Sequence, residues 1–192
     1  MTDPAGAARL GAILRANAGP MRVLETLAPL ELPDWLVFSG AVYQPVWNHL
    51  TSRPPGHGLR DIDVGYFHAD TSWDAEDRVI PHVAASLPPA LPAPVQVRNQ
   101  ARVHLWFETH FGEPYAPLPS TEAALARFVA PAFAVGVRLE PDGSLHIAAP
   151  FGLADLFALR LRPNPDRPLA RAWPAVVRSV RERWPEVSIE GT

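Results

Sequence analysis

Two aspartates separated by one residue are the feature of this sequence most suggestive of chemistry. Asp61 and Asp63 flank Ile62 in a run rich in Ile, Val, Tyr and Phe, which predicts a strand. Alternate side chains of a strand leave the same face, so the two carboxylates point the same way. A divalent cation such as Mg²⁺ prefers oxygen ligands, often one or two carboxylates completed by substrate phosphates and water. The pair therefore predicts a metal site suited to phosphoryl transfer, although acidic pairs also occur at strand edges for solubility.

A turn of two small residues, Ser39-Gly40, lies about twenty residues upstream of the aspartates. It follows the apolar run 35–38, a short buried strand or helix end, and precedes residues 41–51, whose apolar positions recur every four residues as in a helix. Glycine at such a turn lets backbone amides approach a phosphate closely, and the start of a helix favours an anion. The sequence thus predicts a phosphate cradle beside the aspartate pair.

The remaining pattern predicts a mixed sheet packed with helices, an α/β (α+β) fold in one domain over residues 1–192. Residues 1–30 form N-terminal packing helices, 35–110 the core, and 120–192 a hairpin and a C-terminal helix. We expect a helix that starts near Thr71 and that Pro81 kinks or ends, a third strand around 95–97, and a hairpin about the turn 140–143. The segment 99–107 fits a strand or a helix.

Composition excludes several classes of site. The chain has no cysteine, so disulfides, thiolate ligands and cysteine nucleophiles are absent, which fits a reducing compartment. No run of about eighteen apolar residues exists and the first residues lack a secretory pattern, so we expect a cytoplasmic protein without a membrane segment. The net charge of −3 gives no overall attraction to nucleic acid, although a local basic patch stays open. All 17 basic residues are arginine, so phosphate contacts would come from guanidinium groups or backbone amides.

The order of these features resembles the nucleotidyltransferase fold of the polymerase-beta type, in which a Ser-Gly or Gly-Ser turn precedes an acidic pair on an adjacent strand. More closely, the chain is similar to a family of bacterial nucleotidyltransferase-like proteins. The matching stretches follow one another in the chain at 39–42 with 46–48, 61–67, 97–106 and 149–157.

The resemblance implies transfer of a nucleoside monophosphate from a nucleoside triphosphate (NTP) to an acceptor. The acceptor is unknown and could be a small molecule, a protein or an RNA. Mg²⁺ or Mn²⁺ held by Asp61 and Asp63, which are also the catalytic residues, would bridge the triphosphate. Four further residues are candidates for binding the nucleotide or its phosphates, namely Ser39, Gly40, Arg98 and Arg102. An equally good interpretation of each of the two arginines is that it forms an ion pair with a carboxylate on the protein surface.

One departure from the family pattern concerns a third carboxylate, which a complete site of this type usually carries on the next strand. Here that strand reads Val95-Gln96-Val97-Arg98-Asn99 and contains no acid. Asp155 or Glu108 could reach the site from elsewhere, or Asn99 could serve as a neutral ligand. The alternative functions are a catalytically inactive nucleotide-binding or regulatory module of the same fold, and a toxin–antitoxin component.

Other residues near these motifs have structural interpretations that we prefer. Trp47, Tyr66 and Trp106 could stack on a nucleobase, but aromatic side chains among apolar neighbours more often belong to the core. The acids Asp70, Asp74, Glu76 and Asp77 suit the start of a helix, where carboxylates cap and complement the dipole.

Overall fold

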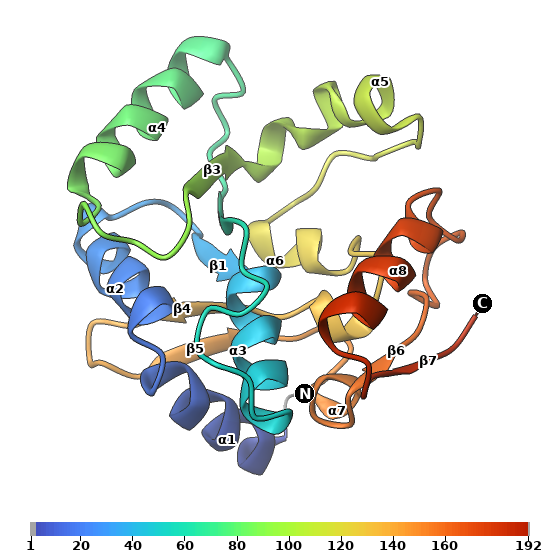
Figure 1. Ribbon diagram of the computed structural model, residues 1–192. Coiled ribbons are helices and arrows are strands. Elements are labelled where there is room, and N and C mark those ends of the chain that lie inside the picture. Colours follow the sequence, from blue (N-terminus) through green and yellow to red (C-terminus); the bar gives the residue numbers. More distant parts are fainter. Residues whose placement is uncertain (1–2, 192) are drawn as a thin grey trace.

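A mixed sheet forms the centre of the protein in a computed structural model that describes residues 3–191 (Figure 1). Its strand order is β3-β2-β1-β4-β5, with β1 antiparallel to β2 and β4, β2 parallel to β3, and β4 antiparallel to β5. The strands span Leu36–Phe38 (β1), Ile62–Tyr66 (β2), Val95–Asn99 (β3), Gly136–Leu139 (β4) and Leu145–Ala148 (β5). The predicted mixed α/β fold is confirmed, including the β4–β5 hairpin.

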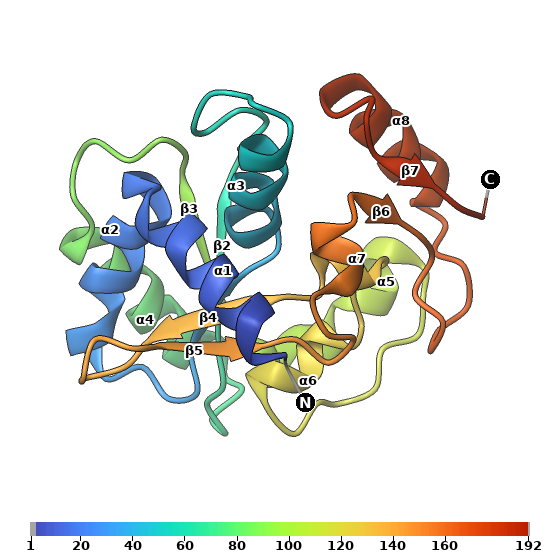
Figure 2. The same ribbon diagram turned by 90° about the horizontal axis from the view of Figure 1, so that it is seen from below.

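The two faces of the sheet differ in how they are covered. Val37, Ile62 and Val64 point into the main core, which α1 (Pro4–Arg15), α2 (Ala18–Leu27) and α3 (Gly40–Leu50) complete. On the other face Leu36 and Phe38 pack with α6 (Thr121–Leu125) in a smaller cluster. Figure 2 shows α2 and α3 on one side of the β4–β5 hairpin and α6 on the other. The small cluster leaves part of the second face open, and that part carries the charged residues of β2 and β3.

Helix α4 (Trp73–Ser86) follows β2 and covers the edge strand β3. Its cap is Ser72, whose hydroxyl accepts a hydrogen bond from the Ala75 amide at 3.2 Å. We expected Pro81 either to kink or to end this helix. Pro81 lies inside the helix, so the expectation that it ends the helix is wrong. Val83, two residues after Pro81, is fully buried, and this packing offsets the single backbone hydrogen bond that a proline removes.

The segment after β3, which the sequence left open, is helical. It forms the 3₁₀ helix η2 (Gln100–Leu105) and the short helix α5 (Phe107–Phe111). Strand β3 stops because the Asn99 side chain accepts the Ala101 amide at 3.1 Å and so turns the backbone. The remaining elements are η1 (Ala28–Leu30), η3 (Pro131–Phe133), α7 (Ala154–Phe157), β6 (Arg160–Leu161), α8 (Trp173–Arg183) and β7 (Ser188–Ile189). Strands β6 and β7 pair in parallel as a separate small sheet.

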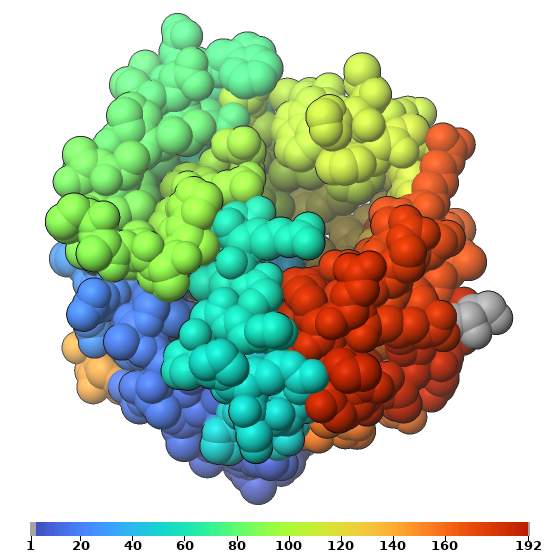
Figure 3. Space-filling view, in the orientation of Figure 1, coloured from blue at the N-terminus to red at the C-terminus, as the bar shows by residue number. Residues whose placement is uncertain are grey.

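The end of α8 holds the loop that leads into β2. Trp184 is fully buried and donates from its indole nitrogen to the Asn48 side chain at 2.8 Å, while Asn48 donates to the His57 carbonyl at 3.0 Å. Arg183 donates to the Gly58 carbonyl at 3.0 Å. In Figure 3 the cyan residues of this loop lie directly against the red α8. The start of β2 is therefore fixed by residues more than a hundred positions later.

None of the helices within residues 3–191 combines the length and the apolar character needed to span a membrane.

Candidate active site

The two aspartates lie at the start of β2, on its open face. Asp63 is the second residue of β2 and pairs with Phe38 of β1 on one side and Gln96 of β3 on the other. Asp61 immediately precedes the strand and shares the face of Asp63 by alternation. The parallel register places Gln96 and Arg98 on that face as well, and both are exposed.

The electrostatics of the pair favour a bound cation. Burial raises the pKa of Asp63 to about 6, the negative charge of Asp61 adds to the rise, and Arg98 opposes it. No group of three or more acidic or histidine side chains within residues 3–191 is arranged to hold a metal. Two carboxylates facing one way nevertheless match the usual protein contribution to a Mg²⁺ site, in which phosphates and water supply the remaining ligands. The residues present therefore fit a divalent metal that arrives with a nucleotide.

Gln96 is the site residue that the sequence analysis missed. It lies opposite Asp63 on the adjacent strand, and its side-chain amide donates to Asp61 Oδ2 at 3.0 Å. A neutral donor thus occupies the position on the third strand where a further carboxylate would face the pair. The sequence contained a signal for this residue. Because Val95 and Val97 alternate toward the core, Gln96 between them must point to the open face.

The Ser39-Gly40 turn lies beside the aspartates because Phe38, the residue before it, pairs with Asp63. Ser39 precedes α3 with φ 57° and ψ −125°, a conformation that favours glycine, and its hydroxyl does not cap the helix. Its carbonyl accepts the amides of Val42 and Tyr43, while the Gly40 and Ala41 amides precede the first helical hydrogen bonds. A Cβ at Gly40 would lie 2.9 Å from the buried Gln44 amide nitrogen, so glycine fits this position best. The turn offers a hydroxyl and free amides to an anion.

A cavity of about 660 Å³ opens on the same face of the sheet. Asp63 and Arg98 line it from the sheet, and Trp73 and Asp77 line it from α4. Aromatic side chains from segments distant in sequence complete its wall, namely Phe38, Trp106, Phe107, Phe111, Tyr115 and Phe128. Figure 3 shows the surface hollowed beside the yellow-green residues of η2 and α5. The volume is in the usual range for a small-molecule site.

Comparison with known proteins decides the family. A family model described as nucleotidyltransferase matches residues 25–189 of the chain. The chain belongs to this nucleotidyltransferase family. No curated protein sequence matches it.

Solved structures support the same fold for this nucleotidyltransferase family member. An NMR structure described as a CCA-adding enzyme head domain aligns with a TM-score of 0.73 at 23% identity, over 93% of this chain and 92% of that one. A complex of a CCA-adding enzyme with CTP aligns with a TM-score of 0.53 at 15% identity, over 95% of this chain and 43% of that one. At these identities the likeness shows a shared fold.

The candidates for a third acid or ligand lie outside this cavity. Asp155 is buried in α7, where it forms ion pairs with Arg160 and Arg162. Asn99 is also buried, and its side chain bonds the His68 amide at 3.0 Å and the His68 carbonyl at 2.9 Å. Glu108 is exposed on α5 and does not line the cavity. The structure brings none of the three to the aspartate pair.

The two candidate phosphate-binding arginines have different surroundings. Arg98 is exposed and lines the cavity with Asp63. Arg102 is only 2% exposed and its Nη1 lies 2.6 Å from Glu76 Oε2, so in this structure its charge is already paired inside the protein. Arg98 is therefore the better placed of the two to meet a phosphate.

The conformation of Ser39 predicts opposite effects for two small substitutions. Ser39→Gly should raise the free energy of unfolding by about 1 kcal/mol because glycine adopts positive φ without strain, whereas Ser39→Ala should not. Both remove the hydroxyl, so both should weaken nucleotide binding. Urea denaturation measures the first effect, and equal stability of the two variants would contradict the strained turn.

The raised pKa of Asp63 makes the stability of the metal-free protein depend on pH. In the unfolded chain the carboxyl ionises near 3.8, but in the folded protein it keeps its proton to about 6. Stability is therefore lost as the pH rises from about 4 to about 6 and stays reduced above that. Asp63→Asn should be more stable than the wild type at about pH 8, by on the order of 2 kcal/mol, and should show no such gain at about pH 4. Urea denaturation in EDTA tests this, and an equal difference at both pH values would refute it.

The position of Gln96 predicts a gain of metal affinity. Gln96→Glu adds a carboxylate to the face of Asp63 and should tighten Mn²⁺ binding about tenfold, because affinity for hard cations follows ligand charge. Gln96→Ala is the matched control and should bind Mn²⁺ no more tightly than the wild type. Isothermal titration calorimetry measures both, and unchanged affinity in Gln96→Glu would show that the side chain does not face the metal.

Proposed function

We propose that this protein transfers a nucleoside monophosphate from an NTP to an acceptor hydroxyl or phosphate in a Mg²⁺- or Mn²⁺-dependent reaction. The observation that supports this best is the pairing of Phe38 with Asp63, since it sets the Ser39-Gly40 turn beside the two carboxylates. The turn, as a phosphate cradle, then lies next to the pair of metal ligands, and Asp63 of that pair also lines a cavity of nucleotide size.

Each group has a distinct role in this proposal. The Ser39 hydroxyl and the first amides of α3 bind oxygens of the triphosphate, and Arg98 neutralises part of its charge. Asp61 and Asp63 hold the cation, with Gln96 orienting Asp61 through its hydrogen bond. The cation, when bound, withdraws charge from the leaving pyrophosphate. The acceptor oxygen forms a new bond to the α-phosphorus, the bond to the bridging oxygen breaks, and the acceptor proton passes to solvent.

Nucleotide binding without transfer is a second candidate function, and the neutral Gln96 favours it. With two carboxylates instead of three, the site carries less negative charge with which to bind two cations. A single cation that arrives with an NTP is enough to balance the charge of the two carboxylates. Such a protein would bind nucleotide and metal as a regulatory module.

Transfer of label from α-³²P-labelled NTPs tests the first proposal. With Mg²⁺ or Mn²⁺ and cell extract as the source of acceptors, the wild type should label an acceptor. Asp61→Ala and Asp63→Ala should each lower the rate at least a hundredfold, because each removes a metal ligand. Glu108→Ala, an exposed acid that does not line the cavity, should leave the rate unchanged.

The outcomes separate the two candidates. Transfer that survives both aspartate substitutions would refute the proposed mechanism. Absence of transfer, together with a metal-dependent rise in melting temperature on adding NTP, would support binding without turnover.

A further inference from the structure

One wall of the cavity is a face of α4 that the proposed chemistry does not use. Trp73, Asp77 and Ile80 follow one another at helical spacing, and all three line the cavity together with Asp63 and Arg98 of the sheet. A nucleotide whose phosphates lie near Asp63 would extend its sugar and base within the same open cavity. The α4 face is therefore in reach of the part of a nucleotide that differs from one NTP to another.

Trp73 is a fixed and open aromatic surface. Its side chain is 68% exposed, and the Arg102 guanidinium carbon lies 4.2 Å from its ring centroid. One face of the indole is thereby covered by a cation, while the opposite face stays free. An indole held by one face can stack a second flat ring on the other without losing much conformational freedom.

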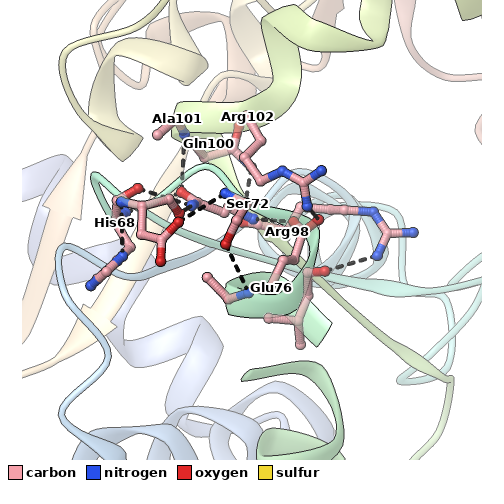
Figure 4. Close-up of polar contacts among 11 residues, drawn as sticks. His68, Ser72, Glu76, Arg98, Gln100, Ala101 and Arg102 are labelled. Carbon is pink, nitrogen blue, oxygen red and sulfur yellow. Dashed lines mark hydrogen bonds and ion pairs between the residues drawn. The ribbon is translucent and has the colours of Figure 1, made fainter. Parts of the chain in front are cut away.

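The support under Trp73 is rigid because it is a buried ion pair. Glu76 is 5% exposed, accepts from Arg102 through Oε2 at 2.6 Å and accepts the Asn99 amide through Oε1 at 2.8 Å. Figure 4 shows Glu76 and Arg102 joined in the polar network at the start of α4, with Ser72 beside them. A residue that the sequence suggested for phosphate binding, Arg102, here positions an aromatic ring.

Asp77 supplies a hydrogen-bond acceptor one helical turn from Trp73. It is exposed on the cavity wall, and none of the ion pairs within residues 3–191 includes its carboxylate. Its negative charge, with that of Asp74 in the same turn, disfavours a phosphate at this place. It favours a neutral ring that carries an amino group.

We propose that Trp73 and Asp77 bind the base of the NTP and select among bases. Trp73 stacks on the ring, and Asp77 accepts a hydrogen bond from an exocyclic amino group. Cytosine, adenine and guanine carry such a group. Uracil does not, and its single N3–H lies between two carbonyl oxygens that repel a carboxylate. The site therefore prefers CTP, ATP and GTP to UTP. This inference rests on the proposed function, because the phosphates must lie at Asp61 and Asp63 for the base to reach α4.

Equilibrium binding of CTP and UTP in the presence of Mg²⁺, measured by calorimetry on the full chain, tests the proposal. The wild type should bind CTP more tightly than UTP. Trp73→Ala should weaken both about tenfold or more, as expected for loss of one stacked base, and Trp73→Phe should retain most of the affinity. Asp77→Ala should reduce the ratio of CTP to UTP affinity about tenfold, since the charge-assisted bond to the exocyclic amino group exists for CTP alone.

Controls on the same helix keep the result interpretable. Asp74→Ala removes an exposed acid of the same turn that does not line the cavity, and it should leave the CTP to UTP ratio unchanged. Melting temperatures of all variants establish that each is folded. The ratio, rather than either affinity, reports on Asp77 because removing its charge changes the attraction for any triphosphate equally.

Three results would overturn the inference: equal affinity of the wild type for CTP and UTP, unchanged affinity in folded Trp73→Ala, or an unchanged ratio in Asp77→Ala. Failure of the proposed function has a different signature. If Asp63→Ala retained full Mg²⁺-dependent binding of CTP, the phosphates would not lie at the aspartates, whatever the result at Trp73.

Discussion

The site depends on the antiparallel pairing of β1 with β2, in the register that sets Phe38 opposite Asp63. A shift of this register by one residue would turn both aspartates toward the apolar core, where ionised carboxylates are costly. The register is specified by burial, because Val37 and Val64 must face the main core together. The same apolar pattern that folds the sheet therefore brings the phosphate cradle to the metal ligands.

The second constraint is the position of the loop before β2. The loop has little regular structure, and its path is set by contacts with α8, where Arg183 bonds the Gly58 carbonyl and Trp184 bonds Asn48. A Cβ at Gly58 would lie 2.9 Å from the Trp184 ring, so the loop and the helix end pack without spare room. The C-terminal helix thus contributes to the site without touching it, because it fixes the position of the chain just before Asp61.

Local patterns in the sequence predicted the strand with the aspartates, the Ser39-Gly40 turn, the hairpin and the principal helices, because each is encoded by neighbouring residues. The long-range features were not predictable in this way. The sequence made Asp155 a candidate third acid for the site, but folding surrounds it with Arg160 and Arg162. Arg102 likewise became the partner of Glu76, twenty-six residues earlier in the chain. The aromatic cavity wall comes from several separate segments, and no periodicity links them.

The two aspartates and an NTP should hold one cation together, and electron paramagnetic resonance of Mn²⁺ measures this directly. The protein alone should bind Mn²⁺ weakly, and an NTP should tighten the binding because its phosphates supply the missing ligands. In the double variant Asp61→Asn, Asp63→Asn the protein should no longer bind the Mn²⁺–NTP complex although it remains folded. Undiminished binding of Mn²⁺–NTP by that folded variant would contradict the account.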